Sequence, residues 1–223
     1  MGTDNLFHKR NMRLATSLLR KKAKQAPYDR VLIVCEGAKT EPKYFQELRS
    51  TFRLSNANII ICGEECGSDP LSVVNYAISK FKDDSDYNRV YCVIDRDKHT
   101  TFDAAIDKLR QTKLGKGTNI YAIVSVPCFE FWLLLHYGYT TRQFCAPGNA
   151  SNCDLVISEL KKKGRIPGYS KGDQNIFAIT RDKLDLAIQN AKQLQQHNQA
   201  TNSNNPSTNI HELVEYLVGL NIR

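Results

Sequence analysis

The sequence predicts an α/β protein: an open, mainly parallel four-stranded sheet flanked by helices, with a helical C-terminal extension. Short apolar runs alternate with amphipathic stretches four times before residue 127. This alternation is typical of βαβ units with right-handed crossovers. Two of the apolar runs end abruptly in carboxylates, which places acidic side chains at the edge where open α/β sheets bind ligands.

Four apolar runs without polar alternation predict strands that are buried on both faces, as in a parallel sheet. These runs are residues 31–35, 58–62, 90–94 and 120–126. Between them, apolar residues recur every three or four positions, which predicts amphipathic helices. The predicted helices cover residues 41–52, 70–81 and 102–109. Thr40 is a suitable N-cap for the first of these helices.

The pattern changes after Pro127. The segment 128–137 is too apolar for a surface helix, so we expect it to be buried, with Trp132 and His136 as core residues. Further helices are expected at 153–163, 180–196 and 210–220, with a polar loop at 198–209. Within that loop, Asn205, Ser207 and Thr208 are expected to cap the last helix.

These segments divide the chain into three parts: a basic N-terminal arm (1–28), an α/β core (29–127) and a helical C-terminal part packed on the core (128–223). The net charge of +8 belongs mainly to the arm, because residues 1–30 hold eight Lys or Arg against two Asp, a net of +6. Basic arms of this kind often contact nucleic acid, whereas the alternative is a solvated tail. The candidate nucleic-acid contacts are Arg13, Arg20, Lys21, Lys22, Lys24, Lys162, Lys163 and Arg165.

The composition favours a protein of the cytoplasm that does not contact a membrane. No apolar run approaches the roughly 20 residues that a membrane helix needs, and the N-terminus lacks the apolar stretch of a signal peptide. We expect the seven cysteines to be reduced. Cys35, Cys92 and Cys128 lie in or beside apolar runs, where cysteine acts as a small hydrophobic residue. Cys62 and Cys66 lack the second pair or the histidine that a zinc site needs.

The carboxylates at the strand ends are the strongest candidates for chemistry. Glu36 follows the run 31–35, and Asp95 and Asp97 follow the run 90–94. If the two strands are neighbours, the three carboxylates converge and repel one another unless a cation joins them. Ligands that are all oxygen suit Mg²⁺ or Mn²⁺. The alternative is that these residues are solvated loop acids.

Three further residues could belong to the same site. Glu41 could be a metal ligand or simply a favourable acid in the first turn of a helix. Glu130 lies in an apolar segment, where a carboxylate needs a metal ion or a buried Arg or Lys. Lys171 stands between glycines and could face a phosphate, or could belong to a flexible basic loop. For His99, an exposed loop position is favoured over a place in the site.

The pattern Glu36-Gly37-x-x-Thr40-Glu41 after one strand, followed by Asp95-x-Asp97 after a later one, resembles the Toprim domain. More closely, the chain resembles the RloB-like family. The resemblance runs from about residue 30 to the end and is carried by residues 33–45, 95–97, 127–136 and 205–209.

The resemblance implies a fold, an activity and an ion. In Toprim enzymes the motif glutamate acts as acid/base or metal ligand, and the DxD pair holds Mg²⁺. The resemblance therefore implies a metal-dependent endonuclease that hydrolyses phosphodiester bonds of RNA (including tRNA) or DNA in anti-phage defence. It also implies a partner ATPase whose gene lies next to the gene of this protein. With the residue-level reasoning above, catalytic roles fall to Glu36, Asp95, Asp97 and Lys171, and metal ligation to Glu36, Glu41, Asp95, Asp97 and Glu130.

Two alternatives remain open from the sequence. The first is a non-catalytic module that binds nucleic acid or a nucleotide and acts with a partner ATPase. The second is nucleotidyl transfer, which is less favoured because no template-binding module is evident. The sequence does not predict the oligomeric state.

Overall fold

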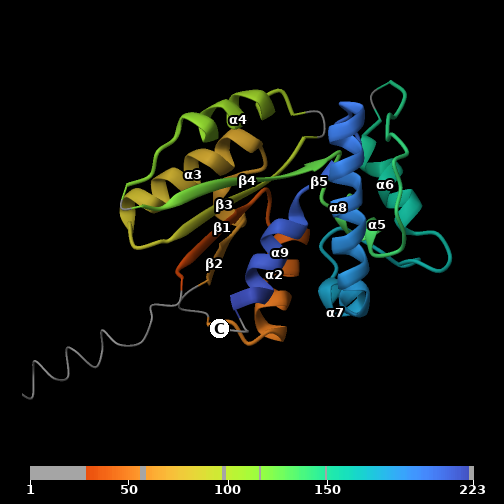
Figure 1. Cartoon of the computed structure of the whole chain (residues 1–223), viewed down its shortest axis with the longest axis horizontal. Coiled ribbons are helices and arrows are strands. Elements are labelled where there is room, and N and C mark those ends of the chain that lie inside the picture. The colour runs from red at the N-terminus through yellow and green to blue at the C-terminus, as the bar shows by residue number, and fades with distance from the viewer. Residues whose placement is uncertain (1–28, 56–58, 97–98, 116, 149, 221–223) are drawn as a thin grey trace, which may run out of the picture.

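The computed structural model describes residues 29–220 apart from 56–58, 97–98, 116 and 149 (Figure 1). These residues form an α/β structure with a five-stranded, mostly parallel sheet in the order β2-β1-β3-β4-β5. The predicted arm, with Arg13, Arg20, Lys21, Lys22 and Lys24, lies outside the described residues, and so does Asp97.

The four predicted strands are present, and all four are parallel. They are β1 (Val31–Cys35), β2 (Ile59–Cys62), β3 (Arg89–Asp95) and β4 (Asn119–Val126). The side chains of β1 are fully buried, as expected for a strand that is covered on both faces. Because β1 and β3 are neighbours, their carboxyl ends meet at one edge of the sheet.

Helices cover both faces of the sheet (Figure 1). On one face, α3 (Pro70–Asp83) and α4 (Phe102–Gln111) pack on a core that includes Leu32, Val34 and Cys92. The other face carries α2 (Thr40–Thr51) and the helices of the C-terminal part. Those helices are α5 (Glu130–Leu135), α6 (Asn152–Leu160), α7 (Ile176–Thr180), α8 (Leu184–Thr201) and α9 (Ile210–Leu220).

The larger core crosses the boundary at Pro127. It joins Ile33 and Val93 from the strands to Leu194 and Leu213 from the C-terminal helices. Trp132, fully buried as predicted, donates a hydrogen bond from Nε1 to the hydroxyl of Tyr44 on α2, at 2.9 Å. The C-terminal part therefore fixes the position of α2, and the first turn of α2 lies at the edge of the sheet where the carboxylates meet.

The prediction of four strands was wrong by one short strand. Ser207 and Thr208 form β5, which pairs antiparallel with Val126 and Ser125 at the end of β4. The predicted polar loop at 198–209 also begins too early, because α8 continues to Thr201. These polar residues have backbone partners that lie far along the chain: Asn209 Oδ1 accepts from the backbone N–H of Val124 at 2.6 Å.

The expected capping roles were correct only in part. Thr208 Oγ1 accepts from the backbone N–H of Ile210 at the start of α9, at 3.3 Å. Asn205 instead bonds both backbone groups of Phe144. Thr40 is the first residue of α2 rather than its N-cap, and its hydroxyl accepts from the backbone N–H of Gly172 at 3.1 Å.

The expectation of a reduced Cys128 was also wrong. Cys128 forms a disulfide with Cys153 at the start of α6, with a Cα–Cα distance of 5.6 Å. The two residues are 25 positions apart in the sequence, so only the packing of α6 against α5 brings them together. Cys35, Cys62 and Cys92 are free and buried. None of the helices in the described part of the chain is long and apolar enough to cross a bilayer.

Candidate functional site

Glu36 stands at the carboxyl end of β1, where the chain turns sharply. Gly37 makes this turn with φ +72°, a conformation that a side chain would disfavour. The Glu36 side chain is only 10% exposed. Its Oε2 accepts a hydrogen bond from the backbone N–H of Asp95 at 3.1 Å. Glu36 is therefore held directly against the end of β3.

Asp95 is the last residue of β3, and it links the sheet to α5. Its Oδ2 accepts from the backbone N–H of Phe129 at 3.1 Å. The pKa of Asp95 is raised well above its usual value, first by burial and then by the negative charges of Glu41, Glu130 and Glu36. Four carboxylates share one partly buried space, where burial and mutual repulsion both favour the protonated form of Asp95.

Glu41 lies in the first turn of α2 and is half-buried. Its pKa is raised from 4.5 to about 8, first by burial and then by the charges of Glu130 and Glu36, while Lys171 acts in the opposite direction. A solvated acid at a helix N-terminus would not behave in this way, because water and the helix dipole both favour its charged form.

Glu130 begins α5 and is 2% exposed. Its Oε1 accepts a hydrogen bond from the hydroxyl of Tyr169 at 2.8 Å and lies 4.0 Å from the Lys171 ammonium. Its Oε2 lies 3.2 Å from the sulfur of Cys153. The sequence left a metal ion or a buried cation as alternatives for this carboxylate, and the structure supplies a tyrosine and a lysine as partners.

Lys171 reaches the site because its loop is fixed on α2. The backbone of Gly172 donates to Thr40 and accepts from the Lys43 ammonium at 2.6 Å. Gly172 has φ +81°, and a Cβ at this position would stand 2.9 Å from the Cβ of Lys39. Only glycine allows this close approach, which carries the neighbouring Lys171 to the carboxylates.

His99 is the residue that the sequence assigned wrongly. It was expected in an exposed loop, but its Nε2 lies 2.9 Å from Glu36 Oε1. The only signal in the sequence was its position four residues after Asp95. His136, predicted as a core residue, is fully buried, and burial lowers its pKa to about 4.

These side chains surround one pocket of about 310 Å³ at the carboxyl ends of β1 and β3. The predicted residues that line it are Glu36, Glu41, Asp95, Glu130 and Lys171, and they are joined by His99 and Cys128. Lys162, Lys163 and Arg165 do not line this pocket. They lie just beyond α6, where Lys162 and Arg165 pair with Glu159.

A model of the family described as RloB-like protein matches residues 31–217. The chain belongs to the RloB-like protein family. No curated protein and no solved structure matches it. In this RloB-like protein every described residue of the carboxylate pocket falls inside the matched span, from Glu36 to Lys171.

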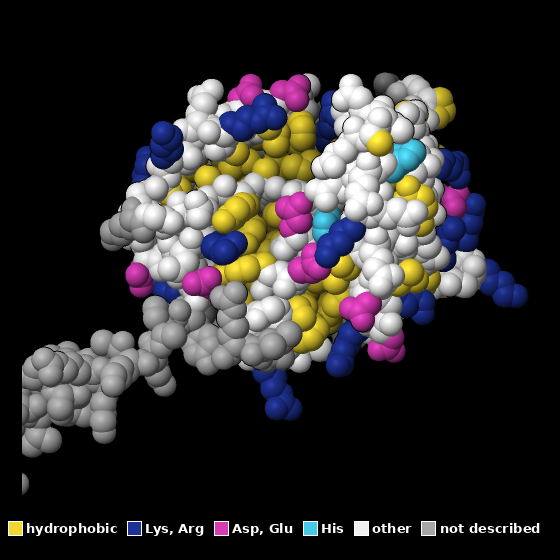
Figure 2. All heavy atoms as spheres, in the orientation of Figure 1, with side chains coloured by type: hydrophobic (Ala, Val, Ile, Leu, Met, Phe, Trp, Pro, Cys, Tyr) yellow, Lys and Arg dark blue, Asp and Glu magenta, His cyan; other side chains and the backbone are white. Residues whose placement is uncertain are grey.

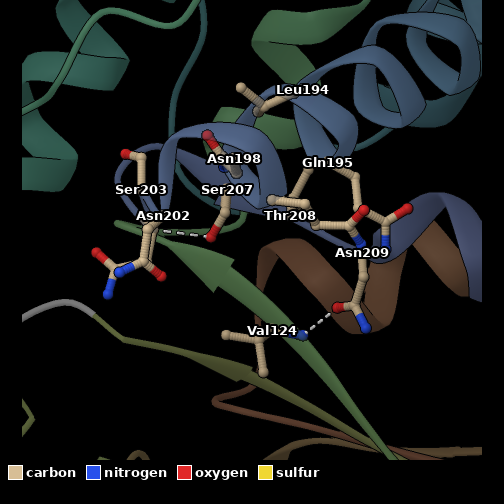
Figure 3. Close-up of a pocket in the computed structure, with 11 residues that line it drawn as sticks. Val124, Leu194, Gln195, Asn198, Asn202, Ser203, Ser207, Thr208 and Asn209 are labelled. Carbon is tan, nitrogen blue, oxygen red and sulfur yellow. Dashed lines mark hydrogen bonds between the residues drawn. The ribbon is translucent and has the colours of Figure 1, made fainter.

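The RloB-like chain has a second hollow of about 370 Å³ between α8 and the end of β4. Figure 3 shows amide and hydroxyl side chains around it, among them Asn198, Asn202 and Ser207. No charged residue of the described chain lines this hollow. It therefore offers hydrogen bonds but no charge for a phosphate or a metal ion.

Proposed function

We propose that this RloB-like protein is a Mg²⁺- or Mn²⁺-dependent nuclease with a Toprim-like core, which hydrolyses phosphodiester bonds of RNA or DNA in bacterial anti-phage defence. The observation that carries the proposal is the convergence of Glu36, Glu41, Asp95 and Glu130 on one pocket with Lys171. The defence context rests on the resemblance of the sequence to RloB-like proteins.

The donor set of the pocket fits a hard divalent ion. Its carboxylates supply oxygen ligands, which Mg²⁺ and Mn²⁺ prefer. Burial first, and then the neighbouring carboxylates, raise the pKa values of Asp95 and Glu41, and a cation in the pocket would favour their charged forms. Glu36, Asp95, Glu41 and Glu130 are the residues that would hold the ion, together with Asp97.

The carboxylates are spread around the pocket rather than gathered at one point. Among the described residues, the one trio whose ligand atoms all lie within 4.8 Å of one another is Cys128, Glu130 and Cys153. With its sulfurs in a disulfide, this trio does not offer thiolates. Binding of one ion by Glu36, Glu41 and Asp95 therefore requires their carboxylates to move closer together.

The residues of the pocket have separate tasks in this proposal. A divalent ion held by these carboxylates would supply positive charge to offset the negative charge of a phosphodiester. Glu36 is oriented by the N–H of Asp95 and by His99, and it acts as the acid/base or the metal ligand. The Lys171 side chain lines the pocket and is 54% exposed, and its ammonium stabilises charge that develops on the phosphate.

The test is cleavage of a mixed RNA and DNA pool by the purified chain in Mg²⁺, Mn²⁺ or EDTA, read by sequencing the fragments. We expect Glu36→Ala and Asp95→Ala to lower the metal-dependent rate by at least about 100-fold, with unchanged circular dichroism. Glu64→Ala removes an exposed acid outside the pocket and serves as the matched control. Unchanged cleavage in both pocket variants would refute the proposal.

The same assay distinguishes the nuclease from the main alternative, a non-catalytic binding module. Binding of nucleic acid without cleavage in either metal would indicate a binding module. Cleavage that appears only with a partner ATPase present would indicate a nuclease that depends on its partner.

A further inference from the structure

The far ends of α5 and α6 form a pocket that differs in chemistry from the carboxylate site. It measures about 190 Å³ and lies beside the turn that follows α5. Aromatic rings and guanidinium groups line it together: Tyr137, Tyr139, Phe144, Arg142 and Arg165. We call it the Tyr139 pocket.

Positive charge exceeds negative charge at this pocket. Glu159 lies at its wall with a side chain that is 15% exposed, and it pairs with three cations. They are Arg142 at 2.9 Å, Lys162 at 2.7 Å and Arg165 at 3.0 Å. One carboxylate neutralises one of the three, so two positive charges remain. Figure 2 shows Lys and Arg side chains gathered on the side of the molecule that α6 forms.

Tyr139 presents a ring without a partner. It is 38% exposed, and within the described part of the chain it makes no ring contact and no hydrogen bond. The preceding Gly138 has φ +148°, a backbone conformation that favours glycine. An exposed aromatic face beside guanidinium groups is the arrangement that binds a base by stacking and its phosphate by charge.

The Tyr139 pocket is close to the carboxylate site because α5 and α6 connect the two. At 1.5 Å per residue, Leu134 in the pocket wall lies about 6 Å along α5 from Glu130. Along α6, Glu159 lies about 9 Å from Cys153, and Cys153 is bonded to Cys128 of the carboxylate site. The disulfide therefore fixes one end of each helix at the carboxylate site, while their other ends form the Tyr139 pocket.

We propose that the Tyr139 pocket binds an unpaired nucleotide next to the phosphodiester that enters the carboxylate site, and that the substrate of this protein is single-stranded at that point. The base stacks on Tyr139, and the adjoining phosphate contacts Arg142 and Arg165. A base within a duplex is covered by its neighbours on both faces, so it cannot stack on a tyrosine. This inference rests on the proposed nuclease function and specifies its substrate class.

The test measures binding rather than cleavage, so it is independent of the metal. A fluorescein-labelled single-stranded oligonucleotide and a blunt-ended duplex of matched length are titrated with the full chain in EDTA, and anisotropy gives Kd. Because stacking on an aromatic side chain has a known range of strengths, Tyr139→Ala should weaken single-strand binding by about 5- to 150-fold. Binding of the duplex should not change, and Tyr139→Phe should bind as the wild type does.

The test of Arg142 has a matched control on the opposite face of the sheet. Arg110 on α4 is exposed and pairs with one carboxylate, Asp107, at 3.5 Å. Arg142→Ala should reduce the slope of log K against log salt by about 0.7, the value for one phosphate contact on a single strand. Arg110→Ala should leave the slope unchanged.

Several results would overturn the inference. The first is an equal Kd for the wild type and Tyr139→Ala on the single strand, and the second is an equal loss of affinity on the duplex and the single strand. The third is a loss in Tyr139→Phe as large as that in Tyr139→Ala, and the fourth is an equal change of slope in Arg142→Ala and Arg110→Ala. Failure of the nuclease proposal gives a different pattern: no metal-dependent cleavage, with the single-strand preference intact.

Discussion

Replacement of Glu41 by glutamine should stabilise the metal-free protein at neutral and alkaline pH. The pKa of this carboxyl is raised from 4.5 to about 8 in the folded state. Folding therefore opposes its ionisation, and stability falls as the pH rises from 4.5 through 8. Glutamine has nearly the same shape and no charge, so it removes this loss.

The size of the effect follows from the shift. At 1.36 kcal/mol per pKa unit, a shift of about 3.5 units costs at most about 5 kcal/mol above pH 8, and about 3 kcal/mol at pH 7. Because Glu41 is only half-buried, solvent screening lowers these figures, and we expect about 2 kcal/mol at pH 8. In a domain of this size that corresponds to a Tm higher by about 4–8 °C.

The assay is thermal unfolding in EDTA at pH 5 and pH 8. Glu41→Gln should raise Tm at pH 8 and have a much smaller effect at pH 5, where the wild-type carboxyl is protonated. Mg²⁺ should raise the Tm of the wild type more than that of the variant. Glu64→Gln, at an exposed acid outside the pocket, should follow the wild type. The reasoning is refuted if Glu41→Gln has the pH profile of the wild type, or if it is less stable at pH 8.

Three other perturbations test the fold and the arm. Tyr44→Phe should lower the free energy of unfolding by about 1–3 kcal/mol in urea, because it leaves the buried Trp132 Nε1–H without an acceptor; an unchanged urea midpoint would contradict this. Glu159 has a pKa lowered to about 2, chiefly by its hydrogen bond with Lys162, so its contribution to stability is present above pH 4.5 and is lost as the pH falls toward 2. Glu159→Gln should therefore be less stable at pH 6 and show a shallower acid limb in circular dichroism, whereas parallel acid limbs would be evidence against it. Removal of residues 1–28 should weaken oligonucleotide binding and flatten its salt dependence; an identical slope would show that the arm is not used.

The strands and their carboxylate ends could be predicted because their signals are local. A run such as residues 31–35, apolar at every position, specifies a strand buried on both faces, and the residue after it must lie at the sheet edge. Glu36 and Asp95 were therefore placed together correctly from the sequence. The helices were found in the same way, from apolar residues at helical spacing.

The parts that were missed depend on contacts between residues far apart in the sequence. The strand β5 has two residues, and nothing in its composition distinguishes it from the polar loop around it. His99 contacts Glu36, which lies far earlier in the sequence at the end of another strand. The Cys128–Cys153 bond requires α6 to pack on α5, and no pattern in the sequence specifies that packing.

The core that continues past Pro127 has a practical consequence for engineering. A fragment that stopped after β4 would retain Glu36, Glu41 and Asp95, but α2 alone would cover the face of the sheet on which the C-terminal helices pack, and the apolar surface left exposed would be prone to aggregation. The family match, which does not stop at the end of β4 but runs on to residue 217, agrees with an indivisible unit. A minimal folded version must therefore keep α8 and α9, although neither helix contributes a side chain to the carboxylate pocket.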